Sequence, residues 1–169
     1  STQTKDNALL GAAELLRQQT GALLSANTKD VARGQENGLS SAMLDRLSLN
    51  EARIDAMAKG LEIMVDLPDP VDETISTWHR PNGLEIRQIR VPLGVVGIIY
   101  ESRPNVTADA SGLCLKAGNA VVLKGGSEAF ETNGAIVDIL SQACSAAGLP
   151  EGAVQLVRST DRQSVTFLL

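Results

Sequence analysis

Residues 91–126 read VPLGVVGIIYESRPNVTADASGLCLKAGNAVVLKGG and predict a strand, a helix and a second strand in direct succession. The two strands are the apolar runs 95–99 and 120–123, in which apolar and polar residues do not alternate. Such runs are typical of strands buried on both faces of a parallel sheet. The segment therefore predicts an α/β fold built around this strand–helix–strand unit.

Polar residues follow both predicted strands. Tyr100-Glu101-Ser102-Arg103 comes after the first strand, and Lys124-Gly125-Gly126-Ser127 comes after the second. Ligands of open α/β sheets bind at the carboxyl ends of the strands. We therefore expect half of a dinucleotide-binding unit here, with its chemistry in these two tetrapeptides.

The residues before this unit predict helices as far as about residue 66. Leucines and alanines recur at steps of three and four from Leu9 to Leu24, as on the buried face of an amphipathic helix. Residues 48–51, SLNE, fit a capping box with Ser48 as the N-cap of a further helix. The sequence LPDP at 67–70 should end that helix.

A β-hairpin or an extended edge strand is predicted over about 76–91, because Pro81-Asn82-Gly83 is a strong turn signal. After the central unit, residues 130–147 predict a helix that stops at Gly148, and residues 154–157 predict a short strand. The stretch Asp161–Leu169 resembles the opening of a helix that is cut off within its second turn. The Rossmann-type domain is thus expected to be truncated.

Composition excludes some classes of protein. A net charge of −5 over 169 residues gives no basic footprint for nucleic acid. No apolar run approaches the ~20 residues of a membrane span, and the N-terminus STQTKDNALL lacks a signal-peptide core, so a cytoplasmic protein is expected. Cys114 and Cys144 lack metal-ligand or CxxC spacing, which predicts reduced packing residues and no metal site.

Residues 124–128, KGGSE, are the leading candidate for a cofactor site. Glycines let the backbone approach a ligand closely, a helix start offers free amides, and Lys124 adds a charge suited to a ribose or its 2′-phosphate. The alternative is a plain strand-to-helix turn with Ser127 as N-cap. The segment is not a GxGxxG fingerprint, so a pyrophosphate need not lie as in ordinary Rossmann dehydrogenases.

The other loop, residues 100–105, contains Arg103, whose planar fork matches a carboxylate or an acyl phosphate. The alternative is that Arg103 is a surface charge and that Pro104 merely begins a helix. Cys114 lies in the middle of a predicted helix, where nothing would lower the pKa of its thiol, so a packing role is favoured over a nucleophilic one. His79, beside the turn, is interpreted as a hairpin residue.

The motifs YESRPNVT at 100–107 and LKAGNAVVLKGGSE at 115–128 resemble the gamma-glutamyl phosphate reductase, or glutamate-5-semialdehyde dehydrogenase, branch of the aldehyde dehydrogenase superfamily. The similarity extends to the N-terminal helices and to GLPEGAVQLV at 148–157. It implies an aldehyde-dehydrogenase-like, Rossmann-type three-layer domain with a helical lead-in that packs onto the cofactor-binding sheet. The implied division is a lead-in over about 1–66, a hairpin over about 76–91 and the first part of an NADP-binding domain over about 92–169, with the catalytic domain absent.

The resemblance also implies roles for residues. Lys124 and Glu128 would contact the adenosine ribose of NADP(H), with Gly125, Gly126 and Ser127 nearby. Ser102 or Asn105 would be an oxyanion donor, and Arg103 a clamp for the substrate. These are the tentative substrate contacts.

The implied reaction is the reduction of L-glutamyl 5-phosphate to L-glutamate 5-semialdehyde in proline biosynthesis. The nucleophilic cysteine is expected beyond Leu169, so this chain alone should be inactive. The competing hypothesis is a non-catalytic nucleotide-binding or scaffold module of the same fold. An ordinary aldehyde dehydrogenase is disfavoured by YESRPN, and the oligomeric state of the full-length enzyme, a homo-oligomer included, stays open.

Overall fold

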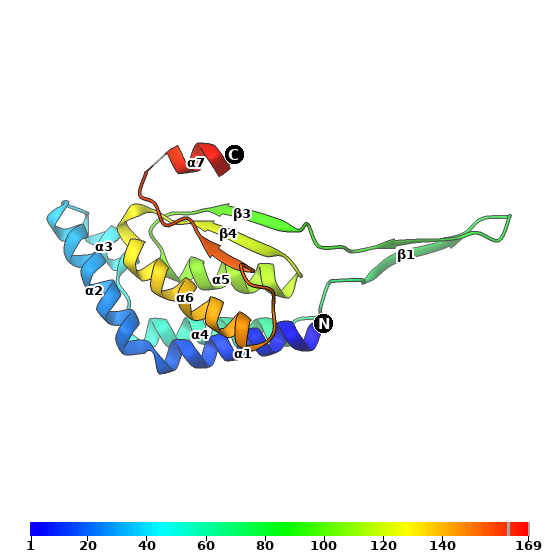
Figure 1. The fold of residues 1–169 in the computed structure, drawn as a ribbon, viewed down its shortest axis with the longest axis horizontal. Coiled ribbons are helices and arrows are strands. Elements are labelled where there is room, and N and C mark those ends of the chain that lie inside the picture. The colour runs from blue at the N-terminus through cyan, green and yellow to red at the C-terminus, as the bar shows by residue number, and fades with distance from the viewer. Residues whose placement is uncertain (162, 169) are drawn as a thin grey trace.

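The computed structural model describes residues 1–161 and 163–168. It begins with the helices predicted as far as about residue 66. No helix in the described ranges is long and apolar enough to span a bilayer. The bounds of the four helices are α1 Thr2–Gln18, α2 Thr20–Glu36, α3 Ser41–Leu47 and α4 Glu51–Asp66. In Figure 1, α1 and α4 lie along the bottom of the molecule, and α2 and α3 lie at its left edge.

The start of α4 differs from the prediction in its cap. Asn50, not Ser48, is the N-cap, and its side-chain oxygen accepts a 2.8 Å hydrogen bond from the amide of Arg53. Ser48 instead closes the preceding helix, because its hydroxyl donates to the carbonyl of Leu44 at 2.6 Å. Asparagine caps a helix as well as serine does, so residue type alone does not identify the N-cap, and the hydrogen bonds of the two side chains do.

The second half of the chain carries the strands. A hairpin of β1 Thr74–His79 and β2 Glu85–Ile89 extends away from the body, and Gly83 at its turn has a φ of 83° (Figure 1). Next come β3 Val95–Ile99, α5 Pro104–Lys116, β4 Ala120–Lys124, a 3₁₀ turn η1 Ser127–Ala129, α6 Phe130–Ala146, β5 Val154–Leu156 and α7 Gln163–Leu168. The predicted helix opening at 161–169 is present as α7, while residues 162 and 169 lie outside the described residues.

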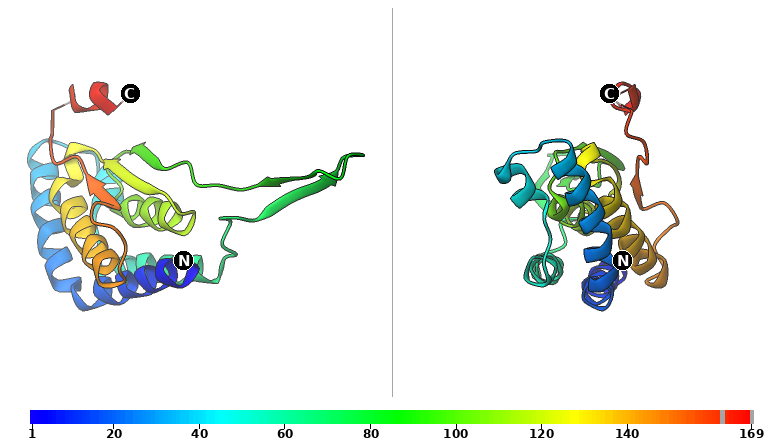
Figure 2. Two further views of the ribbon diagram at one scale, coloured as in Figure 1. Left: turned by 45° about the vertical axis from the view of Figure 1, so that its right-hand side comes forward. Right: turned by 90° about the vertical axis from the view of Figure 1, so that its left-hand side faces the viewer.

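The strands β3, β4 and β5 form a parallel sheet in that order, and both connecting helices lie on the same face (Figure 2). Successive right-handed crossovers in one direction place their helices on one side, which explains this arrangement. The expectation that both central strands are buried on two faces is therefore wrong for β3. Its residues alternate between exposed and half-buried, and Val95 is 70% exposed.

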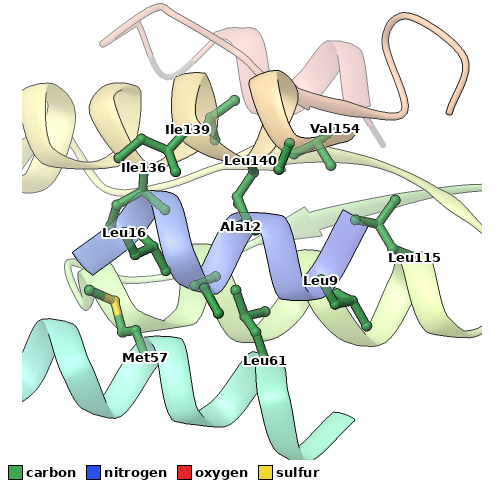
Figure 3. Close-up of a cluster of buried hydrophobic side chains, with 14 of the residues drawn as sticks. Leu9, Ala12, Leu16, Met57, Leu61, Leu115, Ile136, Ile139, Leu140 and Val154 are labelled. Atoms are coloured by element: carbon green, nitrogen blue, oxygen red, sulfur yellow. The ribbon is translucent and has the colours of Figure 1, made fainter. Parts of the chain in front are cut away.

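The hydrophobic core lies between helices rather than within the sheet. Figure 3 shows α1 wedged between two other helices, with Leu16 near Met57 of α4 on one side and Ile136 of α6 on the other. Leu9 and Leu61 are fully buried in the same cluster. The lead-in thus packs on α5 and α6, which in turn cover the sheet, so the molecule has one sheet layer and two helical layers.

Candidate functional site

The loops after β3 and β4 lie side by side at one edge of the sheet. The parallel register pairs Ile99 with Lys124, and the amide of Tyr100 continues the ladder by donating to the carbonyl of Lys124 at 3.1 Å. Beyond the strands, the hydroxyl of Ser102 donates to the Glu128 carboxylate at 2.5 Å. The two tetrapeptides that the sequence singled out are therefore joined directly.

Gly125 and Gly126 are needed for this close approach. A Cβ on Gly125 would lie 2.3 Å from Asn133 Nδ2, and one on Gly126 would lie 2.7 Å from both Ser102 Oγ and Glu128 Oε2. Real Cβ contacts do not occur at such distances. The glycines thus let the turn sit against protein side chains, in addition to leaving its outer surface open.

A buried polar chain supports the turn from below. The hydroxyls of Tyr100 and Thr107 lie 2.7 Å apart, and Thr107 donates to Asn133 Oδ1 at 2.9 Å. Burial raises the pKa of Tyr100, and its hydrogen bond with Thr107 offsets only part of that effect. These hydrogen bonds link the residue after β3 to α5 and α6 next to Gly125, so the loop is held in place.

Lys124 differs from the other two buried lysines. Lys5 and Lys116 are 8% and 4% exposed, and each forms a 2.6 Å ion pair, with Asp69 and Asp6 respectively. Lys124 is 7% exposed, and its ammonium donates to the carbonyl of Gly125 at 3.0 Å. No carboxylate in the described ranges pairs with it, so two of its three N–H groups remain available to a ligand.

The start of α6 departs from the sequence-based argument. Ser127 opens the 3₁₀ turn and caps no α-helix, since α6 begins at Phe130. Two amides in the first turn of α6 are already bonded, because buried Asp30 of α2 accepts from the amides of Glu131 at 3.3 Å and Thr132 at 2.8 Å. The positive end of α6 therefore meets a carboxylate of the protein itself, and an anionic ligand would have to bind elsewhere.

A hollow of about 470 Å³, called here the loop hollow, opens over the joined loops. Of the predicted site residues, Ser102, Arg103, Gly126 and Glu128 line it, together with Glu101. Lys124 and Gly125 are not among its lining residues, and Ser127 lines a separate hollow against α2.

Helix α3 contributes two residues to the loop hollow that the sequence did not single out, Met43 and Arg46. Their helix has only seven residues and lies far from the loops in sequence, so no spacing rule connects them. The one available signal was a basic residue in the last turn of a short helix. Asn105 is not among the residues that line this hollow, and its amide donates to Asp109 at 3.1 Å.

The remaining reactive side chains lie elsewhere. Both cysteines are free and buried. Burial raises the pKa of the Cys114 thiol, and it raises the pKa of the Cys144 thiol to about 11, which is the opposite of what a nucleophile needs. His79 is exposed in the hairpin, with Nε2 3.2 Å from Glu85. No group of three potential metal ligands occurs in the part of the chain that the structure describes.

Helices α5 and α6 cover one face of the parallel sheet, the helical lead-in packs on these two helices, and the loops after β3 and β4 meet at the strand ends. This is an aldehyde-dehydrogenase-like fold. The profile of the aldehyde dehydrogenase family matches residues 2–169, and the chain belongs to this family. Membership in this family indicates a nicotinamide cofactor.

Within the family, the chain is similar to gamma-glutamyl phosphate reductases. It is 58% identical to that of Moorella thermoacetica over 168 residues, which are 99% of the chain and 40% of the relative. The crystal structure of the Thermotoga maritima enzyme superposes with a TM-score of 0.97 at 43% identity, over 99% of this chain and 41% of that one. For the Saccharomyces cerevisiae enzyme the TM-score is 0.89 at 31% identity, over 95% and 42%. The chain thus spans about two fifths of the length of these relatives.

Proposed function

We propose that the protein containing this chain is a gamma-glutamyl phosphate reductase, which reduces L-glutamyl 5-phosphate to L-glutamate 5-semialdehyde in proline biosynthesis with NADPH. The observation that carries the proposal is the 58% identity over 99% of the chain, combined with a TM-score of 0.97 to a second enzyme of that name. A cytoplasmic location belongs to the same proposal.

Lys124 and Glu128 are assigned to the cofactor ribose. The buried ammonium of Lys124 has spare N–H groups and no paired carboxylate in the described ranges, which suits ribose hydroxyls or a 2′-phosphate. Glu128 at the rim of the loop hollow can accept a ribose hydroxyl, while Gly125, Gly126 and Ser127 shape the turn beside it. A bound nicotinamide cofactor would supply the hydride.

On the substrate side, the assignment is to Arg103, with Ser102 and Asn105 in secondary roles. The hydroxyl of Ser102 donates to Glu128 and the amide of Asn105 donates to Asp109, so both are engaged within the protein. Arg103 lines the loop hollow and has neither a hydrogen bond nor an ion pair from its guanidinium to any described residue. Its fork is thus free to bind an acyl phosphate or a carboxylate.

The activity is tested with the whole protein and with the 169-residue chain, by NADP- and phosphate-dependent oxidation of glutamate-5-semialdehyde. We expect turnover by the whole protein and none by the chain, because Cys114 and Cys144 are buried. Turnover by the chain that Cys114→Ser abolishes would overturn the inactivity. Cofactor binding without turnover by the whole protein would instead favour a nucleotide-binding or scaffold module.

The cofactor assignment is tested by calorimetric titration of the whole protein with NADPH. Lys124→Met keeps the length of the buried side chain and removes its charge, and we expect about tenfold weaker binding or more. Lys29→Met on the exposed surface of α2 is the matched control and should bind as the wild type does. Equal affinity of both variants would remove Lys124 from the site.

A further inference from the structure

A second hollow, called here the head hollow, adjoins the loop hollow. Its volume is about 420 Å³, and it lies between the start of α5 and the segment that joins α3 to α4. Arg46 and Arg103 line both hollows, so the two spaces meet at these guanidinium groups. A ligand longer than one hollow can therefore occupy both and pass the two arginines.

The arginines around the head hollow are not equivalent. Arg53 is held in place by the protein, because it donates to Asp45 Oδ1 at 2.9 Å and to the carbonyl of Ser48 at 2.7 Å. The guanidinium groups of Arg46 and Arg103 form neither a hydrogen bond nor an ion pair with any residue that the structure describes. Two guanidinium groups that line one concave surface have the charge and the geometry to bind an anion.

An acid faces the same space. Asp109 of α5 lines the head hollow, and its Oδ2 accepts the hydrogen bond from Asn105 that fixes the carboxylate. Its Oδ1 lies 3.5 Å from the position of a Cβ on Gly60, so α4 approaches closely behind it. No cation of a described residue pairs with Asp109. A free guanidinium and an unneutralised carboxylate on one concave wall complement a zwitterion.

We propose that the head hollow binds the amino-acid head of the substrate, with Arg46 on the α-carboxylate and Asp109 on the α-ammonium. The acyl end then passes Arg103 into the loop hollow, where Glu128 and the cofactor turn lie. This inference rests on the proposed function and adds the residues that select an α-amino acid. It predicts that the α-carboxylate and the α-ammonium of the substrate each contribute separately to kcat/KM.

The test uses the whole protein and four aldehydes that share the four-carbon stretch from the aldehyde carbon to the position that bears the amine in the first of them. Glutamate-5-semialdehyde carries both groups, 5-oxopentanoate lacks the ammonium, 4-aminobutanal lacks the carboxylate, and butanal lacks both. Arg46→Met should lower kcat/KM about 10- to 100-fold for the two carboxylates and leave the other two unchanged. Asp109→Asn should lower it for the two amines only. The KM for NADP should not change in either variant.

Two further variants and the wild type separate the outcomes. Arg46→Lys should restore part of the loss, and Arg87→Met on the exposed hairpin should have no effect. An active wild type whose Arg46→Met and Asp109→Asn variants affect all four aldehydes equally, or none, overturns the inference alone. A wild type without turnover on glutamate-5-semialdehyde overturns the proposed function, and the inference with it.

Discussion

On the helix-covered face of the sheet, Val121 and Leu123 of β4 are fully buried, whereas Val95 of β3 on the opposite face is 70% exposed. The difference does not come from residue type, since Val121, Leu123 and Val95 are all apolar aliphatic residues. It comes from connectivity, because both crossovers place α5 and α6 on one side. An apolar strand can therefore be buried on both faces, but the positions of the connecting helices determine which face is covered.

The largest expected effect contrasts these two faces directly. Leu123→Ala should lower the free energy of unfolding by about 3 kcal/mol, because the side chain is fully buried and its removal leaves a cavity. Val95→Ala should cost less than about 1 kcal/mol, since its side chain is already largely in water. Urea unfolding followed by circular dichroism measures both, and similar losses would show that the open face is covered in solution.

Much of the fold could be predicted because local signals agree with the tertiary structure. The alternation of β3, α5 and β4, the turn at Gly83 and the stop at Gly148, where φ is 81°, all follow from patterns within about ten residues. The uncovered face could not be predicted, because it depends on the direction in which strands are added. The sequence did not identify Asn50 as the cap because Ser48 and Asn50 are both good capping residues, and only the hydrogen bonds in the structure distinguish them.

The candidate site was predictable where one segment carries it. The glycine turn at 125–126 follows a buried strand, so its position at the sheet edge could be inferred from the sequence. Arg46 could not be found in this way, because a seven-residue helix distant in sequence brings it to the loops. The hydrogen bonds from the first amides of α6 to Asp30 could not be predicted either, because they join residues about a hundred positions apart.

The second prediction concerns buried Asp30 of α2, which accepts hydrogen bonds from the start of α6. Asp30→Ala removes the acceptor for the amides of Glu131 and Thr132 and for the Thr132 hydroxyl, and leaves those buried donors unsatisfied. We expect a loss of about 2–3 kcal/mol in the free energy of unfolding. Asp138→Ala is the matched control, because its pair with Arg158 is exposed and should contribute less than about 0.5 kcal/mol. Equal effects in the same urea titration would refute the capping role of Asp30.

The third prediction compares glycines on two sides of the sheet. Gly125→Ala should destabilise the protein by about 1–3 kcal/mol, since the added Cβ would overlap Asn133 and force the turn outward. Gly97→Ala in β3 has nothing within 4 Å of the new Cβ and should be neutral or stabilising by a few tenths of a kcal/mol. Thermal unfolding measures the contrast, and a neutral Gly125→Ala would mean that the turn is loosely held.

The smallest expected effect concerns the acid that ties the end of the lead-in to α1. Burial favours the neutral form of Asp69, but hydrogen bonds from Lys5, Thr2 and the amide of Val71 outweigh it and lower its pKa to about 2. Because the folded pKa lies below the ordinary value of 3.8, the carboxylate stabilises the protein above about pH 4. That contribution, on the order of 1 kcal/mol for this pair at the edge of the core, should disappear as the pH falls toward 2. Asp69→Asn and Lys5→Met should each reduce the loss of stability between pH 5 and pH 2 in urea titrations. If the free energy of unfolding of both variants depends on pH as it does in the wild type, the stabilising role of the Lys5–Asp69 pair is contradicted.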